Sequence, residues 1–365
     1  METKNSQSEK IAFCITCMNR LNHIRQTLEK NILENYIQGK VEFVLLDYNS
    51  QDGLEEWVNS NMKKYIDERI LVYYRTTEPT HYLRSHSRNM AFRLANATIL
   101  CNLDADNFLG KGFADFMLDE FSKYDNIFYA NSYSPEGAFG RICIRNKNFM
   151  EVRGYNESLQ GWGFEDNDIQ NRLIKNDIKL MSMKNPEFNH YIEHPDLDRV
   201  SDEHVFKNLY KMFVTYINPY TSGILLLFND YKTEQYTLVN NLHLNLLVEF
   251  SNISEPLLDD RVRVVIQEDV IKGSWKEEKD IIFIKENDNY YFLNNNASSF
   301  EMNNKTYYFV HVDTVISKII IHLTSAINYN EAVKQMKTQS KINENGFGRG
   351  IVYKNFDLTN KIVLS

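Results

Sequence analysis

The residues with the clearest chemical potential form an acidic cluster behind a glycine-flanked tryptophan. Residues 161–168 read Gly-Trp-Gly-Phe-Glu-Asp-Asn-Asp, and apolar residues at helical spacing follow at once. The two glycines allow an unusual turn around Trp162, and the first turn of a helix favours the charge of Glu165 and Asp166. A tight loop with an acidic N-cap explains part of this pattern, but a cap needs one carboxylate and not a cluster. A carboxylate placed here can remove a proton from a substrate hydroxyl.

Asp104 and Asp106 are a second candidate pair. They flank Ala105 directly after an apolar, strand-like run. A bend after that strand would aim both carboxylates at one ion, and hard oxygen ligands suit Mg²⁺ or Mn²⁺ bridging a diphosphate. The pair alone is a weak signal. The acidic positions of an EF-hand are not filled further along the chain, which excludes that kind of calcium site.

Polar residues at two further strand ends and at one helix start complete the candidate site. Thr16 ends the first expected strand, and Asp47 ends the second. Asp47 could accept a hydrogen bond from a uracil or a ribose, although an Asx-turn cap explains it equally well. Arg84 and Arg88 open a helix, and two arginines at a helix N-terminus suit a diphosphate. A solvated basic helix start is the alternative.

The elements that would position these residues alternate between apolar runs and amphipathic segments. The expected strands are 11–16, 41–46, 70–74 and 98–103, and helical periodicity begins at Leu21, Leu54 and Ser85, the last segment running to Ala97. This order implies parallel βαβ units, in which ligands bind beyond the carboxyl ends of the strands. The polar residues above fall at those ends. The sequence contains neither a dinucleotide-binding glycine fingerprint nor a Walker-type loop, which disfavours dinucleotide redox and P-loop chemistry.

Composition bounds the remaining possibilities. A chain of 365 residues is long enough for two domains. The formal net charge of −8 argues against nucleic acid as the main partner. Residues 1–10 contain no signal-peptide core, and no apolar run reaches the length of a membrane-spanning helix. We therefore expect a cytoplasmic protein, for which peripheral contact with the inner face of a membrane is compatible.

The pattern of the chain changes after about residue 218, so we expect a catalytic domain over 1–218 and a β-rich accessory domain over 219–365. Apolar runs between Asn-rich turns are typical of strands. We expect a sandwich-like arrangement with one helix near 330–341. A scaffold role is the default for this domain, with acceptor binding and oligomerisation as alternatives. The runs expected to form strands are 242–250, 261–266, 280–284, 290–293, 305–312 and 315–323.

Taken in order, these motifs resemble the GT-A glycosyltransferases, which have a Rossmann-like, mostly parallel sheet with helices on both faces. Most of the pattern resembles the inverting family 2: Thr16, Asp47-x-x-Ser50-x-Asp52-Gly53, Arg88-Asn89 and Leu103-Asp104-Ala-Asp106. The Gly-Trp-Gly-x-Glu-Asp block is similar to the β-1,4-galactosyltransferase and N-acetylgalactosaminyltransferase branch. The resemblance covers about residues 9–215.

The resemblance implies roles for individual residues. Trp162 matches the tryptophan of a mobile loop that closes over donor and acceptor. Glu165 and Asp166 match the acceptor-binding acidic pair, and Asp166 takes the position of the general base. Like charge from Glu165 and Asp168 would raise the pKa of that base. Asn167 departs from the third acidic residue of the branch, which leaves the acceptor sugar open.

The resemblance also implies a metal, Mn²⁺ or Mg²⁺, bound by Asp104, Asp106 and a histidine after the acidic helix. His194 fits best by distance, and His190 is close enough to compete. The nucleotide-sugar contacts are then expected to include Thr16, Asp47, Arg84, Arg88, Asp104 and Trp162.

We therefore expect an inverting, metal-dependent hexosyltransferase. It would move a Gal-, GalNAc- or Glc-type hexose from a UDP-sugar to a hydroxyl group of a glycan. The expected setting is the synthesis of a surface polysaccharide, in which the acceptor glycan could be lipid-linked. A nucleotidylyltransferase is one alternative, but it needs a glycine-rich loop after the first strand, and residues 17–20 contain no glycine. A non-catalytic glycan- or nucleotide-sugar-binding protein on a degenerate GT-A scaffold is the other. The intact Asp104, Asp106 and Asp166 argue against it.

Overall fold

The chain divides into two compact units. The computed structural model describes residues 9–131, 138–218, 221–239, 265–266 and 270–365. The first unit comprises Met1–Leu159, Glu165–His194 and Lys341–Ser365, and the second comprises Gln160–Phe164 and Pro195–Ser340. This division differs from the expected boundary between residues 218 and 219, because residues 195–218 belong to the second unit and residues 341–365 return to the first.

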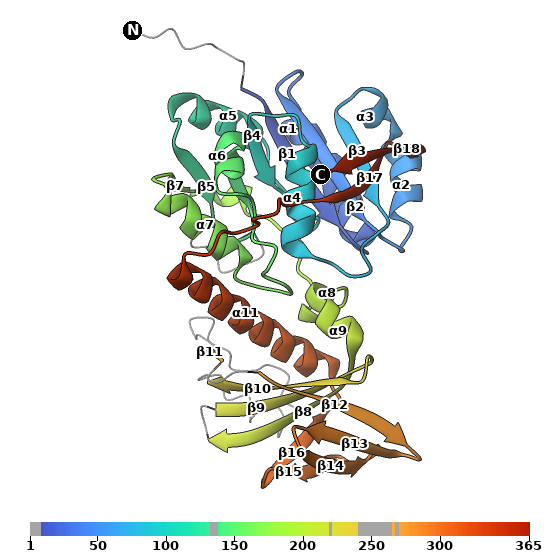
Figure 1. Cartoon of the computed structure of the whole chain (residues 1–365). Coiled ribbons are helices and arrows are strands. Elements are labelled where there is room, and N and C mark those ends of the chain that lie inside the picture. Colours follow the sequence, from blue (N-terminus) through green and yellow to red (C-terminus); the bar gives the residue numbers. More distant parts are fainter. Residues whose placement is uncertain (1–8, 132–137, 219–220, 240–264, 267–269) are drawn as a thin grey trace. The chain divides into compact units, whose positions relative to one another are not determined.

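A nine-stranded mixed sheet forms the centre of the first unit (Figure 1). Strand β1 pairs in parallel with β2 and β4, β2 with β3, and β5 with β7. The pairs of β6 with β4 and β5, and of β17 with β3 and β18, are antiparallel. In spatial order the strands are β18 (Asp357–Leu364), β17 (Gly350–Lys354), β3 (Leu71–Thr76), β2 (Val41–Tyr48), β1 (Ile11–Cys17), β4 (Ile99–Asn102), β6 (Ile142–Arg145), β5 (Ile127–Ala130) and β7 (Lys179–Ser182).

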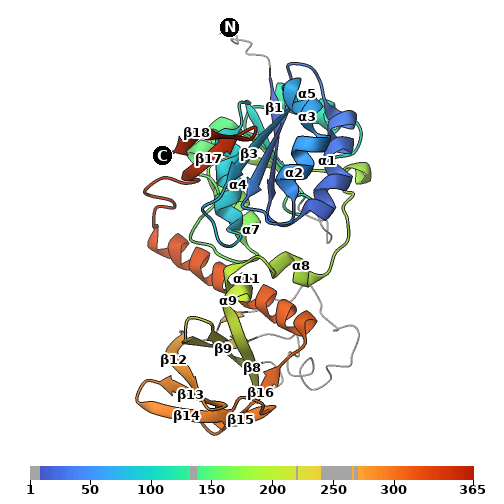
Figure 2. The same cartoon turned by 90° about the vertical axis from the view of Figure 1, so that its right-hand side faces the viewer.

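Alternate residues of β1 show how this sheet divides the core. Ile11, Phe13 and Ile15 pack into the core on one face, and Ala12 and Cys14 pack into the core on the other, as the period of a strand requires. Helices therefore cover both faces (Figure 2), and the expected α/β fold is confirmed. One core contains residues of α1 (Leu21–Asn35), α2 (Leu54–Asn61), α3 (Lys63–Asp67), α5 (Phe113–Lys123) and the 3₁₀ helix η1 (Pro186–Phe188), and the other contains residues of α4 (Arg84–Leu94), α6 (Asn146–Glu151) and α7 (Glu165–Lys175).

The four strands expected from the sequence are present as β1 to β4 with bounds close to those predicted. The predicted helix 85–97 is α4, which ends earlier, at Leu94. The amphipathic segment from Leu54 forms two helices, α2 and α3, which are separated at Met62.

The C-terminal segment 341–365 adds an antiparallel edge to the first unit's sheet. Strand β17 pairs with β3, and the ring of Phe356 stacks on Tyr73 with the centroids 4.9 Å apart. Arg93 of α4 donates a hydrogen bond to the carbonyl oxygen of Phe347 at 2.7 Å. A strand pattern does not reveal which sheet a strand joins, so the sequence analysis left this segment with the β-rich residues before it.

The second unit combines one antiparallel sheet with the long helix α11 (Asp313–Thr338). Ile319, Ile320 and Leu323 of α11 share a core with β8, β9 and β10. Alternate residues of β8 and β9, such as Phe213 and Leu225, face a second core that also contains residues of β13 and β15. The sheet is therefore continuous and curled, not two separate packed sheets. Its strands are β14 (Asn289–Asn294), β13 (Ile281–Glu286), β12 (Ile271–Glu278), β10 (Lys232–Val239), β9 (Thr221–Phe228), β8 (Leu209–Asn218), β16 (Lys305–Val310) and β15 (Ser299–Met302), with β11 (Val265–Ile266) paired to β10; two short helices, α8 (Asp196–Val200) and α9 (His204–Asn208), precede it.

The β-rich character of this unit is confirmed, with one exception. The runs 280–284, 290–293 and 305–312 correspond to β13, β14 and β16, whereas 242–250 and 261–264 lie outside the described residues. The prediction of a strand over 315–323 was wrong, because these residues belong to α11. Their β-branched side chains favour strands locally, but the helical face that packs on the sheet overrides this preference. The helix expected near 330–341 is the end of α11.

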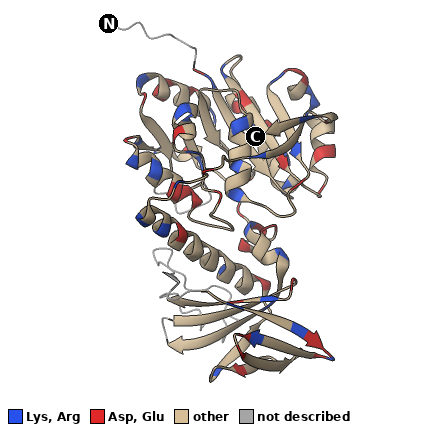
Figure 3. Cartoon of the chain, in the orientation of Figure 1, with Lys and Arg blue, Asp and Glu red and all other residues tan. Residues whose placement is uncertain are grey.

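No helix among the described residues is both long and apolar enough to cross a membrane. Lys and Arg are interspersed with Asp and Glu along the elements of both units (Figure 3).

Candidate functional site

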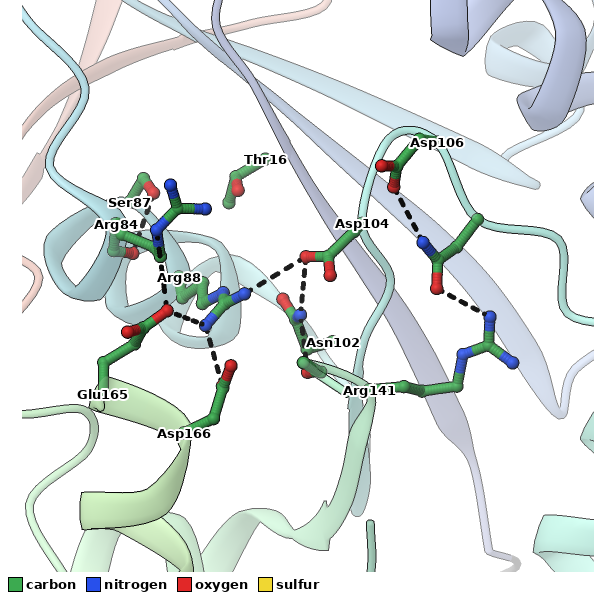
Figure 4. A network of polar contacts seen from close by, with 12 residues as sticks. Thr16, Arg84, Ser87, Arg88, Asn102, Asp104, Asp106, Arg141, Glu165 and Asp166 are labelled. Carbon is green, nitrogen blue, oxygen red and sulfur yellow. Dashed lines mark hydrogen bonds and ion pairs between the residues drawn. The ribbon is translucent and has the colours of Figure 1, made fainter. Parts of the chain in front are cut away.

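A single guanidinium gathers three of the predicted site carboxylates (Figure 4). Arg88 Nη1 lies 2.8 Å from Asp166 Oδ1 and 3.3 Å from Glu165 Oε1, and Arg88 Nη2 lies 3.2 Å from Asp104 Oδ1. The Arg88 side chain is only 3% exposed. Charge-assisted hydrogen bonds of this kind are strong. The fold thus joins residues from three distant segments into one group, which we call the Arg88 cluster (Arg88, Asp104, Glu165 and Asp166).

One strand end and two helix starts position the Arg88 cluster. Asp104 follows β4, and Asn102 Nδ2 donates to Asp104 Oδ1 at 3.0 Å and to the carbonyl oxygen of Gly140 at 2.9 Å. Glu165 is the first residue of α7, where the helix dipole stabilises negative charge. Arg84 is the first residue of α4, and its Nε lies 3.5 Å from Glu165 Oε1. Neighbouring side chains and the start of α7 therefore hold these acidic groups in place.

The electrostatics of the cluster suit proton transfer near neutral pH. Burial raises the pKa of Asp166 to about 7; Arg88 opposes this shift, and the charges of Glu165 and Asp104 reinforce it. Burial alone would lower the pKa of Arg88, but Asp166 and Asp104 raise it well above its ordinary value. Arg88 therefore stays cationic while Asp166 can gain or lose a proton, which is the condition for a general base.

The sequence analysis expected the charge of Asp168 to raise the pKa of Asp166, but in the structure Asp168 pairs with another residue. Asp168 Oδ2 lies 2.7 Å from Arg172 Nη2 in the next turn of α7. This pairing gives Asp168 a cation of its own, and Asp104 supplies like charge to Asp166 instead.

Gly140 is a member of the site that the sequence analysis missed. A Cβ atom at this position would lie 2.8 Å from both Arg88 Nη2 and Asp104 Oδ2, and 3.3 Å from Asp166 Oδ2. Only a residue without a side chain leaves room for these groups. No local motif marks Gly140, because the residues that it approaches are distant in sequence.

Asp106 forms a separate polar pair with His194. His194 Nε2 lies 2.7 Å from Asp106 Oδ2, and Asn107 Nδ2 donates to Asp106 Oδ1 at 2.7 Å. Burial alone would raise the pKa of Asp106, but His194 and Asn107 lower it below its ordinary value. The amide of Ile192 donates to the carbonyl oxygen of Asp106 at 2.8 Å. This backbone hydrogen bond holds the segment before His194 next to Asp106. We call Asp106 and His194 the Asp106–His194 pair.

The structure separates the two histidine candidates. His194 contacts Asp106, whereas the side chain of His190 is 64% exposed and its Nε2 lies 3.7 Å from Glu187 Oε2. His23 of α1, which the sequence analysis did not single out, places its ring edge-on to His194 with the centroids 5.3 Å apart.

The described structure groups fewer candidate metal ligands than the sequence analysis expected. Asp104 and Asp106 point to different neighbours (Figure 4), and among the described residues no three His, Cys, Asp or Glu side chains are grouped around one point. The carboxylate and the imidazole of the Asp106–His194 pair are adjacent and are hydrogen-bonded to each other.

Two residues at the first strand ends are held by the protein itself. Asp47 is fully buried; its Oδ1 accepts from the amide of Ser50 at 2.7 Å, and its Oδ2 accepts from the Tyr73 hydroxyl at 2.7 Å. These contacts match the turn-capping alternative for Asp47. Thr16 Oγ1 lies 2.7 Å from the Tyr82 hydroxyl oxygen.

Trp162 lies in the second unit, in the segment Gln160–Phe164. Its ring is partly buried against the core that α11 shares with the sheet. The chain passes from the second unit to the first between Phe164 and Glu165. The motif read as one block in the sequence is thus divided between two units.

Comparison with protein families gives one match. A family model described as the N-terminal domain of galactosyltransferase matches residues 122–195. This stretch includes Gly140, Trp162, Glu165, Asp166 and His194, but neither Arg88 nor the two aspartates after β4. A search of the curated proteins found no match.

Solved structures resemble the chain at low sequence identity. A mannosyltransferase from Pyrobaculum calidifontis, in complex with GDP-mannose and Mn²⁺, matches with a TM-score of 0.41 at 16% identity, over 49% of this chain and 55% of that chain. TarS 1–349 from S. aureus, in complex with UDP, matches with a TM-score of 0.41 at 13% identity, over 48% and 58%. GalNAc-T7 with UDP, GalNAc and Mn²⁺ matches with a TM-score of 0.41 at 15% identity, over 49% and 43%. The chain spans about half the length of each of these structures.

Proposed function

We propose that the protein is an inverting glycosyltransferase that moves a hexose from a UDP-sugar to a hydroxyl group of a glycan, in surface polysaccharide synthesis. The observation that carries the proposal is the Arg88 cluster, in which Asp166 and Glu165 lie beside each other against one guanidinium. Burial raises the pKa of Asp166 to about 7. The family match over residues 122–195, which includes Glu165 and Asp166, supports the same class of reaction.

The acceptor is held and deprotonated by Glu165 and Asp166. Glu165 Oε2 is buried and has no hydrogen-bond partner among the described residues. Leaving a buried acceptor group unpaired is costly, and a sugar hydroxyl would satisfy it. Asp166 then takes the proton of the attacking hydroxyl through Oδ2, the oxygen that Arg88 does not bind. Attack from the face opposite the leaving group inverts the anomeric centre.

The donor is assigned to residues around this base. Arg84 and Thr16 would contact the nucleotide diphosphate. Arg88 organises the carboxylates and does not bind the diphosphate directly, because its guanidinium is buried among them. Asp47 is left out of the donor site, since both of its oxygens are occupied within the fold.

Asp106 and His194 would hold a divalent ion, with Mn²⁺ preferred over Mg²⁺. Such an ion neutralises the charge that develops on a departing nucleoside diphosphate. Asp104 stays with Arg88, where its charge helps to raise the pKa of Asp166.

A glycan- or nucleotide-sugar-binding protein without catalysis is the second candidate, and release of UDP separates the two. We would incubate the protein with a panel of UDP-sugars and Mn²⁺ and compare wild type with Asp106→Ala and Asp166→Asn. Asp168→Asn is the matched control, because Asp168 lies on the same helix but pairs with Arg172. Turnover of one donor that both site variants abolish and the control retains is the expected result. Binding of a UDP-sugar without UDP release would support the non-catalytic alternative.

A further inference from the structure

Helix α11 binds the backbone of the tryptophan loop, which we define as residues 160–164. Asn328 Nδ2 donates to the carbonyl oxygen of Gly163 at 2.7 Å. Thr324 Oγ1 lies 2.9 Å from the carbonyl oxygen of Trp162 and 2.9 Å from that of Ile320 in its own helix, so its one proton is shared. Thr324 and Asn328 are four positions apart and face the same side of the helix. Both are buried.

Two glycines allow the loop backbone to lie against α11. A Cβ atom at Gly161 would lie 2.8 Å from Thr324 Cγ2, and one at Gly163 would lie 2.8 Å from Ser325 Cβ. The two glycines therefore permit the backbone to rest directly on α11, as well as supplying positive φ angles of 77° and 98°.

Phe164 shows that the loop is held in a strained conformation. Its φ angle is 73°, which is unfavourable for a bulky side chain. Strain of this kind persists only where the surroundings fix it. The ring of Phe164 meets Tyr329 of α11 edge-on at a centroid distance of 5.2 Å, so α11 also holds this end of the loop.

We propose that α11 fixes the conformation of the tryptophan loop and that Thr324 and Asn328 are positioning residues for glycosyl transfer. The consequence for the reaction rests on the function proposed above. The helix is itself anchored, because Ile319, Ile320 and Leu323 belong to the core of the second unit. Glu165 follows Phe164 directly in the chain. If the loop lost its contact with α11, both Trp162 and the backbone that leads to Glu165 and Asp166 would become more mobile.

The test uses 5-fluorotryptophan in the full-length protein, which contains three tryptophans. The Trp162 resonance is assigned by its loss in Trp162→Phe. We expect Asn328→Leu to shift and broaden this resonance and to speed amide hydrogen exchange in residues 160–164 by about five-fold, the effect of losing one hydrogen bond. Thr324→Val should act in the same direction with a smaller effect, because its proton is shared. The resonances of Trp57 and Trp275 should not change, which shows that the variants are folded.

Thr338→Val is the matched control. Thr338 lies on α11 and its hydroxyl bonds the carbonyl oxygen of Lys334 at 3.0 Å, so the substitution removes the same kind of helix contact far from the loop. If Asn328→Leu and Thr324→Val leave the Trp162 resonance and the exchange rates as they are in Thr338→Val, the inference is overturned.

A second readout links the loop to the reaction. In the two loop variants the ratio of sugar transfer to donor hydrolysis should fall by about five-fold per hydrogen bond lost, with the KM for the UDP-sugar less affected. A Trp162 resonance that responds in a protein without transferase activity would support the contact between α11 and the tryptophan loop and would remove both the proposed function and the positioning role in transfer. Normal transfer-to-hydrolysis ratios in variants whose resonance has moved would overturn the catalytic role of the contact.

Discussion

Asp104 and Asp106 are separated by one residue, yet they take part in two different polar regions of the first unit. Asp104 belongs to the Arg88 cluster, where three carboxylates surround one guanidinium. Asp106 belongs to the Asp106–His194 pair, where a single carboxylate faces an imidazole. Figure 4 shows the Arg88 cluster together with the side chain of Asp106.

The two regions shift the pKa of an aspartate in opposite directions. Burial raises the pKa of Asp166 to about 7, with support from Glu165 and Asp104. Burial acts in the same direction on Asp106, but His194 overcomes it and the pKa falls. The difference lies in how many carboxylates share one cation. A carboxylate that shares one cation with others suits proton transfer, and a carboxylate with a partner of its own suits a stable negative charge.

Removing the base should have the largest effect. Asp166→Asn is expected to lower the rate of sugar transfer by about 10²- to 10⁴-fold, the usual contribution of a general base. Mn²⁺ binding should stay as in wild type, because Asp166 is outside the Asp106–His194 pair. Steady-state kinetics beside Asp168→Asn measure this, and a variant that keeps more than about a tenth of the wild-type rate contradicts the assignment of Asp166.

Changes to the Asp106–His194 pair should act on the metal first. We expect Asp106→Asn and His194→Ala each to weaken Mn²⁺ binding by at least about 10- to 100-fold. Mutation of residues that only orient metal ligands already causes a loss of this size. His190→Ala is the matched control, because that ring is exposed and pairs with Glu187. Electron paramagnetic resonance of free Mn²⁺ gives the affinity. Equal affinities in His194→Ala and His190→Ala would remove His194 from the metal site.

A methyl group at Gly140 should damage one region and spare the other. Gly140→Ala places a carbon 2.8 Å from Arg88 and Asp104, and overpacking of this kind costs about 1–3 kcal/mol. We expect a loss of about 10- to 100-fold in kcat/KM with Mn²⁺ affinity unchanged, since each 1.4 kcal/mol is about tenfold. Loss of both properties together would show that the two regions are not independent.

The two aspartates should have opposite effects on thermal stability when metal is removed. The pKa of Asp166 is raised on folding, so its contribution to stability is complete below its unfolded pKa of about 3.9 and is lost as pH rises through the folded value. The pKa of Asp106 is lowered, so its contribution is present above about pH 3.9 and lost as pH falls through its folded value. In EDTA at pH 8, Asp166→Asn should raise Tm and Asp106→Asn should lower it, each by a few degrees, or about 1 kcal/mol. Shifts of the same sign in differential scanning calorimetry would contradict the comparison.

The sequence was sufficient for those parts of the site that local patterns define. Apolar runs revealed β1 to β4, and the acidic residues at the end of β4 and the start of α7 stand out because their chemistry is concentrated in a few positions. The fold around them follows from the alternation of strands and helices.

Long-range packing decided the rest. The capping role of Asp47 depends on Tyr73 in the neighbouring strand, and the importance of Gly140 depends on side chains that only the folded chain brings close. The β-branched residues at the start of α11 predict a strand because local preference does not include the contacts between this helix and the sheet. The return of residues 341–365 to the first sheet is likewise a property of tertiary pairing.

The most direct test of the account is the pH dependence of kcat/KM for sugar transfer in wild type and in Glu165→Gln. The base is active when deprotonated, so kcat/KM should fall tenfold per pH unit below an inflection near 7, the pKa of Asp166. Glu165→Gln removes a charge that raises this pKa, and the inflection should move to lower pH by about one unit, which corresponds to about 1.4 kcal/mol. A profile without an inflection near neutrality in wild type, or an inflection that Glu165→Gln leaves in place, would contradict the role of Asp166 as the base of the Arg88 cluster.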